Sequence, residues 1–209
     1  LRDNSMPALA GLFAAMLHNL NDVTVESTTC TTPLEIMVGW DLCQMIGFPT
    51  TKGSVPWARL TADGSIATTE AIWATRECKC LPFSLKMLIN ENKPIQYVDA
   101  RGVRRETRPE KARSVSITPV GSTSSVRLVD ASRWELFNTP MDQILKLPRK
   151  ISAFCGIPNS PEFDDVLWNA LRAYTINSIG WPQMMRWMGG CSGAFPSPVI
   201  ITSSTRHHS

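Results

Sequence analysis

Histidine is scarce in this chain, and that scarcity limits the chemistry that the sequence can support. The three histidines among 209 residues are His18, His207 and His208, and the last two lie at the chain end. Histidine is the commonest general base and the commonest metal ligand near neutral pH. The sequence therefore favours a protein that is not an enzyme, and we expect no catalytic residues, no metal site and no cofactor.

One short turn is typical of nucleophilic chemistry. Residues 190–196 read Gly-Cys-Ser-Gly-Ala-Phe-Pro. This segment resembles the nucleophile turn of chymotrypsin-like proteases, whose pattern is Gly-x-Ser-Gly. The resemblance implies Ser192 as the nucleophile, His18 as the base, and Asp41 or Asp99 as the group that orients the histidine. A chymotrypsin-like protease is therefore an alternative function.

Two cysteines, Cys78 and Cys80, are separated by a single lysine. If this segment is a strand, both side chains point to the same face. They could form a redox pair, but a disulfide between residues this close is strained, so we interpret them as buried structural thiols. The six cysteines include no Cys-x-x-Cys pair, which favours free thiols in a reducing, intracellular compartment.

A run of basic residues could contact nucleic acid or another acidic partner. Basic side chains neutralise phosphates, but Glu106 and Glu110 interrupt this run and can pair with its members. The formal net charge of +3 permits RNA binding without arguing for it. A salt-bridged surface loop is the preferred interpretation, and RNA contact is the alternative. The candidate residues are Arg101, Arg104, Arg105, Arg108 and Arg113.

A cluster of tryptophan and methionine lies near the C-terminus. Both residue types are enriched at the centres of protein interfaces, and both also fill irregular cores. Apolar residues occupy nearly every side of this short segment, so we expect some of them to contact another chain. The candidate interface residues are Trp181, Met184, Met185, Trp187 and Met188.

The elements that must position these residues are mostly short strands. A first helix is predicted over 9–20, with Asn4 or Ser5 as its cap. The residues that follow this helix are rich in types that favour β-strands. Within them, the pair Asp63-Gly64 is typical of a tight hairpin turn. Residues 41–46 suit a short helical turn. The expected strands are 23–25, 34–38, 57–61, 65–73, 83–89, 95–98, 114–119 and 126–129.

The last third of the chain is predicted to be helical. One helix opens at Pro140 with Thr139 as its cap, and a second begins at Ser160. The second helix ends at Gly180 or Pro182, and residues 194–209 form an extended tail. The apolar stripe of the second helix consists of Phe163, Val166, Leu167, Ala170, Leu171 and Tyr174.

These elements predict a single domain over residues 1–209 that is mainly β. The expected architecture is an antiparallel, jelly-roll-like β-sandwich with an N-terminal helix and C-terminal helices. No stretch approaches the ~20 apolar residues that a membrane-spanning helix needs. The chain begins at Leu1 without a methionine, which is consistent with polyprotein processing or with removal of a transit peptide.

In general texture the chain resembles coat proteins of small RNA viruses. The resemblance implies a structural subunit of a capsid, located in the virion or the host cytoplasm. Its expected partners are other copies or sibling subunits of the same assembly, with RNA as a further partner. A second alternative, besides the protease, is an RNA-contacting subunit of an organellar or ribosomal complex.

Overall fold

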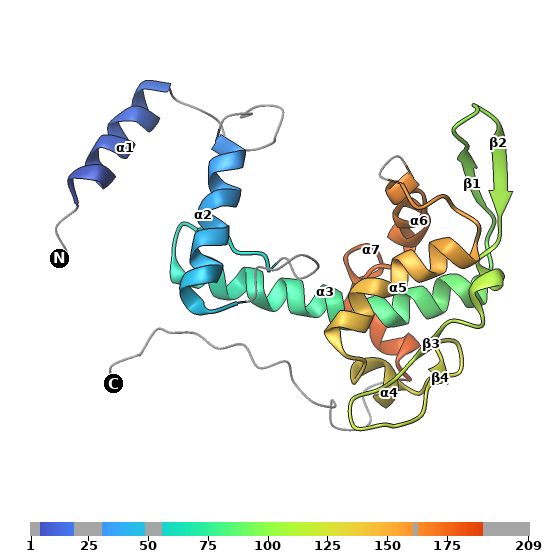
Figure 1. Ribbon diagram of the computed structural model, residues 1–209. Coiled ribbons are helices and arrows are strands. Elements are labelled where there is room, and N and C mark those ends of the chain that lie inside the picture. The colour runs from blue at the N-terminus through green and yellow to red at the C-terminus, as the bar shows by residue number, and fades with distance from the viewer. Residues whose placement is uncertain (1–4, 19–30, 49–55, 161–162, 190–209) are drawn as a thin grey trace. The chain divides into compact units, whose positions relative to one another are not determined.

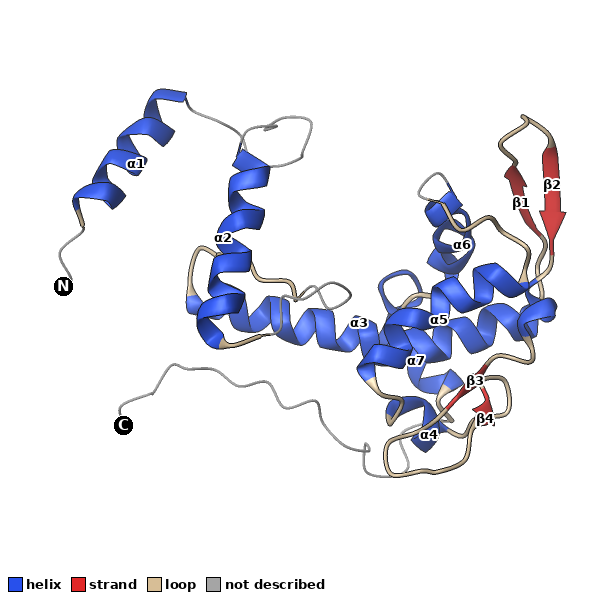
Figure 2. Ribbon diagram, viewed as in Figure 1, coloured by secondary structure: helices blue, strands red, loops and turns tan. Residues whose placement is uncertain are grey.

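Helices dominate the structure, a computed structural model that describes residues 5–18, 31–48, 56–160 and 163–189. The described strands form two small antiparallel pairs (Figure 2). The expected mainly β, jelly-roll-like sandwich is therefore wrong. Three segments expected as strands, 34–38, 65–73 and 83–89, lie within long helices. The expected strand at 23–25 and the tail at 194–209 lie outside the described residues.

Contacts divide the chain into two compact units, Leu1–Ala67 and Thr68–Ser209. The first contains α1 (Met6–His18) and α2 (Thr31–Ile46). Helix α1 confirms the predicted N-terminal helix, and the backbone N–H of Ala8 donates to Ser5 Oγ over 3.4 Å at its start. The single domain expected over 1–209 stays a prediction, because helix α3 runs continuously across the boundary between the units.

Helix α3 (Gly64–Glu91) begins where the sequence predicted a hairpin turn. The carboxylate of Asp63 accepts a hydrogen bond of 2.8 Å from the backbone N–H of Ile66. This is the bond that an N-cap side chain makes to the third helical residue. An Asp-Gly pair suits both a tight turn and a helix start, and here the helix that follows decides between them. The hairpin expected around Asp63-Gly64 is therefore wrong.

We expect Asp63→Ala to fray the start of α3. Loss of the cap leaves the Ile66 N–H without its acceptor, which costs about 1 kcal/mol. Amide hydrogen exchange at residues 66–68 should accelerate by roughly fivefold, since about 1 kcal/mol corresponds to that factor. Asp63→Asn is the matched control, because asparagine caps as well as aspartate. Equal acceleration in both variants would contradict the capping role.

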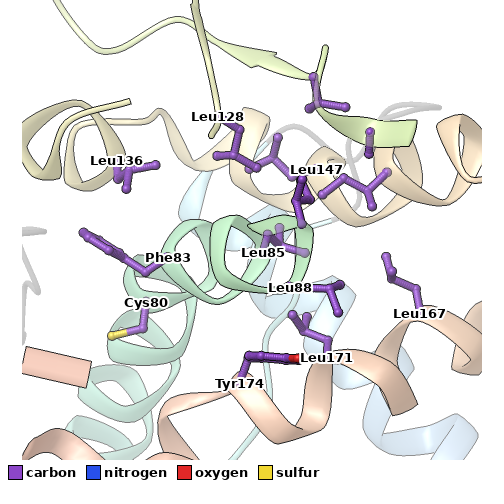
Figure 3. Close-up of a cluster of buried hydrophobic side chains, with 14 of the residues drawn as sticks. Cys80, Phe83, Leu85, Leu88, Leu128, Leu136, Leu147, Leu167, Leu171 and Tyr174 are labelled. Atoms are coloured by element: carbon purple, nitrogen blue, oxygen red, sulfur yellow. The ribbon is translucent and has the colours of Figure 1, made fainter. Parts of the chain in front are cut away.

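The second half of α3 forms the centre of the core of the second unit. Its buried residues Cys80, Phe83, Leu85, Leu88 and Ile89 face more than one side of the helix. Figure 3 shows these α3 side chains surrounded by residues from several other segments. A helix packed on several sides buries more than one stripe, which is why this segment also matched the alternating pattern of a strand. The labelled neighbours are Leu128, Leu136, Leu147, Leu167, Leu171 and Tyr174.

Helices from the last part of the chain pack around α3 (Figure 1). They are α4 (Arg133–Phe137), α5 (Met141–Phe154), α6 (Asp164–Leu171) and α7 (Ile176–Trp187). The sequence predicted that this part of the chain is helical. The predicted stripe is confirmed, since Phe163, Leu167, Leu171 and Tyr174 are all buried. The long helix expected from Ser160 is interrupted at Thr175, whose backbone is extended.

A second interruption lies inside α7, at Gly180. Its backbone has φ 72° and ψ 165°, a region open essentially to glycine alone. The helix expected from Ser160 to Gly180 or Pro182 therefore ends earlier than predicted, before Thr175, and Gly180 instead kinks the helix that follows. This kink separates the start of α7 from the methionine-rich half.

The four strands lie between α3 and α4. Strand β1 (Ile95–Val98) pairs with β2 (Arg104–Thr107), with Ile95 opposite Thr107 and Val98 opposite Arg104. The strand predicted at 95–98 is confirmed, but its expected partner at 83–89 is helical. Strand β3 (Ser116–Ile117) pairs with β4 (Val126–Arg127), inside the segments expected as strands. Each pair is too small to form one layer of a sandwich.

Candidate functional site

A small apolar pocket lies in the second unit between α3, α5, α6 and the start of α7. We call it the α3–α7 pocket. Its volume is about 180 Å³. From α3 its lining residues follow helical spacing, with Glu77, Leu81 and Ser84 at i, i+4 and i+7. The other lining residues are Cys78, Cys80, Leu145, Pro148, Trp168, Thr175 and Ile176.

Both cysteines of the Cys-Lys-Cys segment line this pocket, although they lie on a helix and not on a strand. Cys80 is 3% exposed, and burial raises its pKa to about 12, with the nearby Glu77 carboxylate adding to the effect. Burial also raises the pKa of Cys78, and Glu77 contributes there too. Both groups are therefore neutral thiols near pH 7, unlike activated cysteine nucleophiles, whose pKa is lowered.

We expect Cys80 to resist alkylation in the folded protein at pH 8. A thiol with a pKa of about 12 has a thiolate fraction at pH 8 about a thousandfold lower than one with an ordinary pKa of 9.0. Iodoacetamide labelling followed by peptide mass spectrometry should show little modified Cys80 in buffer and full modification in urea. Cys78, which is partly exposed, should label at an intermediate rate. Equal rates for Cys80 with and without urea would contradict its burial.

The raised pKa of Cys80 also has a consequence for stability at high pH. The thiol ionises with an ordinary pKa of 9.0 in the unfolded chain, whereas burial raises its pKa to about 12 in the folded protein. The preference of the folded state for the neutral thiol therefore stabilises the protein below pH 9. This contribution is lost progressively as the pH rises from about 9 towards 12.

An ion pair lies at the Glu77 side of the pocket. Arg76 Nη2 donates to Glu77 Oε1 over 2.7 Å and to Asn177 Oδ1 over 2.8 Å. Asn177 follows the lining residue Ile176, so Arg76 connects α3 to the start of α7. The side chains of Arg76 and Glu77 are 42% and 26% exposed, so both charges are within reach of solvent. Glu77 lines the pocket, and Arg76 is the ion-pair partner of this lining residue.

Sequence reasoning missed Arg76, Glu77, Trp168 and Thr175 as a group. A strand was expected at 83–89, and the shared face of Cys78 and Cys80 was predicted for a strand, whereas the whole segment is helical. The spacing of Glu77, Leu81 and Ser84 was the available signal for one helix face. Trp168 and Thr175 come from segments about a hundred residues away, and only tertiary contact brings them to that face.

The predicted arginines gather around the β1–β2 hairpin and the turn after it. Arg104 and Arg105 lie on β2, Arg101 lies in the hairpin loop, and Arg108 and Arg113 flank the 3-10 turn Pro109–Ala112. Asp99 Oδ2 accepts from Arg105 Nε over 2.8 Å, so one arginine is ion-paired, but with Asp99 and not with the expected Glu106 or Glu110. Glu110 instead accepts from Asn92 Nδ2 over 2.8 Å. An acidic partner for these arginines stays a prediction.

The carboxylate of Asp99 also accepts from the backbone N–H groups of Arg101 and Val103, over 2.9 and 3.0 Å. The Arg105 guanidinium and these N–H groups hold the pKa of Asp99 below its usual range. The hairpin therefore gains from this carboxylate at neutral pH and loses that gain as the pH falls through the lowered pKa.

The methionines of the predicted interface cluster belong to the core of this chain. Met184 is completely buried, and Met185 and Met188 are buried as well. Trp187 is partly buried and packs against the core near Tyr174, with ring centroids 6.3 Å apart. Trp181 is 45% exposed and so retains a surface that another chain could cover. An interface at these residues stays a prediction.

The residues of the expected protease site are divided between the two units and a segment that the structure does not describe. Ser192, with the Gly-x-Ser-Gly turn, lies outside the described residues, as do His207 and His208. His18 and Asp41 lie on α1 and α2 of the first unit, and the Asp99 carboxylate is bound by its own hairpin. Among the described residues, no group of three acidic, histidine or cysteine side chains could hold a metal ion. No described helix is long and apolar enough to cross a membrane.

Comparison with known proteins finds similarity to enzymes. No protein-family model matches the chain. An L-tyrosine decarboxylase from Levilactobacillus brevis is 38% identical over 81 residues, which are 39% of this chain and 12% of that protein. One from Enterococcus faecium is 38% identical over 86 residues, covering 41% and 13%. One from Enterococcus faecalis is 28% identical over 142 residues, covering 68% and 16%.

These similarities correct the functional predictions. The chain spans between 12% and 16% of the length of these curated relatives, so the similarity concerns one part of each of them. The expected viral capsid protein is wrong, and so are its two alternatives, a protease and an RNA-contacting subunit. The expectation that the chain is not an enzyme is also wrong. The scarcity of histidine does not argue against an enzyme here, because the matched segments are only 12% to 16% of the relatives' length.

Proposed function

We propose that this chain is part of an enzyme that decarboxylates an aromatic L-amino acid. The observation that carries the proposal is the 38% identity over 81 residues with a protein named L-tyrosine decarboxylase. Two further proteins of the same name match over 86 and 142 residues. Three matches that agree in name support a shared chemistry more strongly than any one of them.

The reaction sets clear requirements. The bond between Cα and the carboxylate breaks, CO₂ leaves, and a proton takes its place on Cα, so the product is an arylalkylamine. Substrate and product both carry a ring and an ammonium group, and they differ by one carboxylate. A part of such an enzyme can contribute by holding the ring away from water and by positioning the charged groups. The described residues of the second unit offer these two features at the α3–α7 pocket.

The proposal is tested by the release of CO₂. The protein is isolated in its native form, with any polypeptide that accompanies it, and supplied with carboxyl-labelled L-tyrosine, L-phenylalanine or L-glutamate. We expect labelled CO₂ and the matching amine in equal amounts from an aromatic substrate, and neither from L-glutamate. Release of CO₂ from none of the three amino acids would overturn the proposal. Release from L-glutamate alone would overturn the aromatic specificity.

A further inference from the structure

We infer that the α3–α7 pocket binds a free aromatic L-α-amino acid, with the ring inside the pocket and the two charged groups at Arg76 and Glu77. The choice of an amino acid rests on the proposed function. The requirement for a ring and for two opposite charges comes separately, from the lining of the pocket and from its edge. Each of these features is a property of the described residues.

The ring is indicated by the size and the chemistry of the walls. A volume of about 180 Å³ is smaller than the ~300–1,000 Å³ of sites for drug-sized ligands, and it suits a single ring. Leu81, Pro148 and Ile176 supply aliphatic surface, and Trp168 supplies an aromatic face. Leu145 and Trp168 are 62% and 45% exposed, so a bound ring would cover apolar surface that now faces water.

The charged groups are indicated by the ion pair at the edge. A free amino acid carries an ammonium and a carboxylate on neighbouring atoms, and Arg76 and Glu77 offer the complementary charges on neighbouring residues. The two hydrogen bonds from Arg76 to Glu77 and Asn177 both use Nη2. A guanidinium carries five N–H donors in a planar fork, so such a partly exposed side chain retains donors for a carboxylate.

The test compares ligands that lack one feature at a time. Isothermal titration calorimetry of the native protein measures L-tyrosine and L-phenylalanine against phenethylamine, which lacks the carboxylate, and 3-phenylpropionate, which lacks the ammonium. N-acetyl-phenylalaninamide keeps the ring without either charge, as in a peptide, and L-leucine lacks the ring. We expect the two aromatic amino acids to bind most tightly, and each single loss to weaken binding by about tenfold.

Variants then locate the binding. Arg76→Ala should weaken the binding of L-phenylalanine about tenfold and leave the binding of phenethylamine unchanged, because only L-phenylalanine has a carboxylate that can bind Arg76. Glu77→Gln should weaken the binding of phenethylamine and leave the binding of 3-phenylpropionate unchanged. Arg127→Ala is the matched control, since Arg127 is also an exposed, ion-paired arginine but is not a lining or edge residue of the pocket. The indole N–H resonance of Trp168, assigned with Trp168→Phe, should shift when L-phenylalanine binds.

Several results would overturn the inference. These are equal effects of Arg76→Ala on L-phenylalanine and phenethylamine, tightest binding of N-acetyl-phenylalaninamide, equal binding of L-leucine, or no binding at millimolar concentrations. If Arg76→Ala does not affect the turnover of L-tyrosine, the inference about this pocket is wrong and the proposed function stands. If the ligands bind with the expected pattern but no CO₂ is released, the proposed function is wrong and the binding site stands.

Discussion

Leu147→Ala is expected to lower the free energy of unfolding by about 2–5 kcal/mol, because it removes methyl groups from a core position and leaves a cavity. Leu147 is completely buried on α5 and belongs to the core cluster around α3. Figure 3 shows it next to Leu85 of α3 and below Leu128. Urea unfolding, followed by circular dichroism and by tryptophan fluorescence, measures the change.

The matched control is Leu145→Ala on the same helix. Leu145 is 62% exposed, so its truncation should change the free energy of unfolding by no more than about 0.5 kcal/mol. If Leu147→Ala does not fold, Ile151→Val at another completely buried position of α5 should cost about 0.5–1.5 kcal/mol. Equal losses for Leu145→Ala and Leu147→Ala would mean that α5 does not pack by the face described.

Gly180→Ala is expected to cost about 1–3 kcal/mol of stability through its backbone. A Cβ at this position would lie 3.7 Å from Cδ of Pro182, an ordinary contact, so crowding is not the cause. The cause is the conformation, because φ 72° with ψ 165° is strained for any residue with a side chain. Thermal and urea unfolding should both report the loss.

Gly64→Ala is the control for this substitution. Gly64 has no positive φ, and a Cβ there would meet nothing within 4 Å. The same chemical change should therefore alter stability by less than about 0.5 kcal/mol. An unchanged stability in Gly180→Ala would show that the kink in α7 is not maintained in solution.

The failure of the β-sandwich prediction has a specific cause at residues 83–89. Phe83, Leu85, Met87 and Ile89 alternate with Ser84, Lys86 and Leu88, which is close to the pattern of a half-buried strand. In the structure Ser84 and Leu88 are as buried as Leu85, because the helix is packed on more than one side. The predicted alternation therefore described a solvent face that this segment does not have.

The candidate site could be predicted only in part for a related reason. Cys78 and Cys80 were expected to be buried structural thiols; Cys80 is buried, whereas Cys78 is only partly buried. The pocket that they line was not foreseen, because its other walls come from α5, α6 and α7. Its Arg76–Glu77 edge depends on Asn177, a residue that lies 101 positions along the chain from Arg76.

Local interactions determined what the sequence by itself could specify. The first helix, the strand at 95–98 and the stripe from Phe163 to Tyr174 depend on caps and short-range spacing, so they followed from neighbouring residues. The tertiary structure alone decided that α3 is buried on several sides and that a pocket forms beside Cys78. These features depend on contacts between residues far apart in the chain, which no local pattern records.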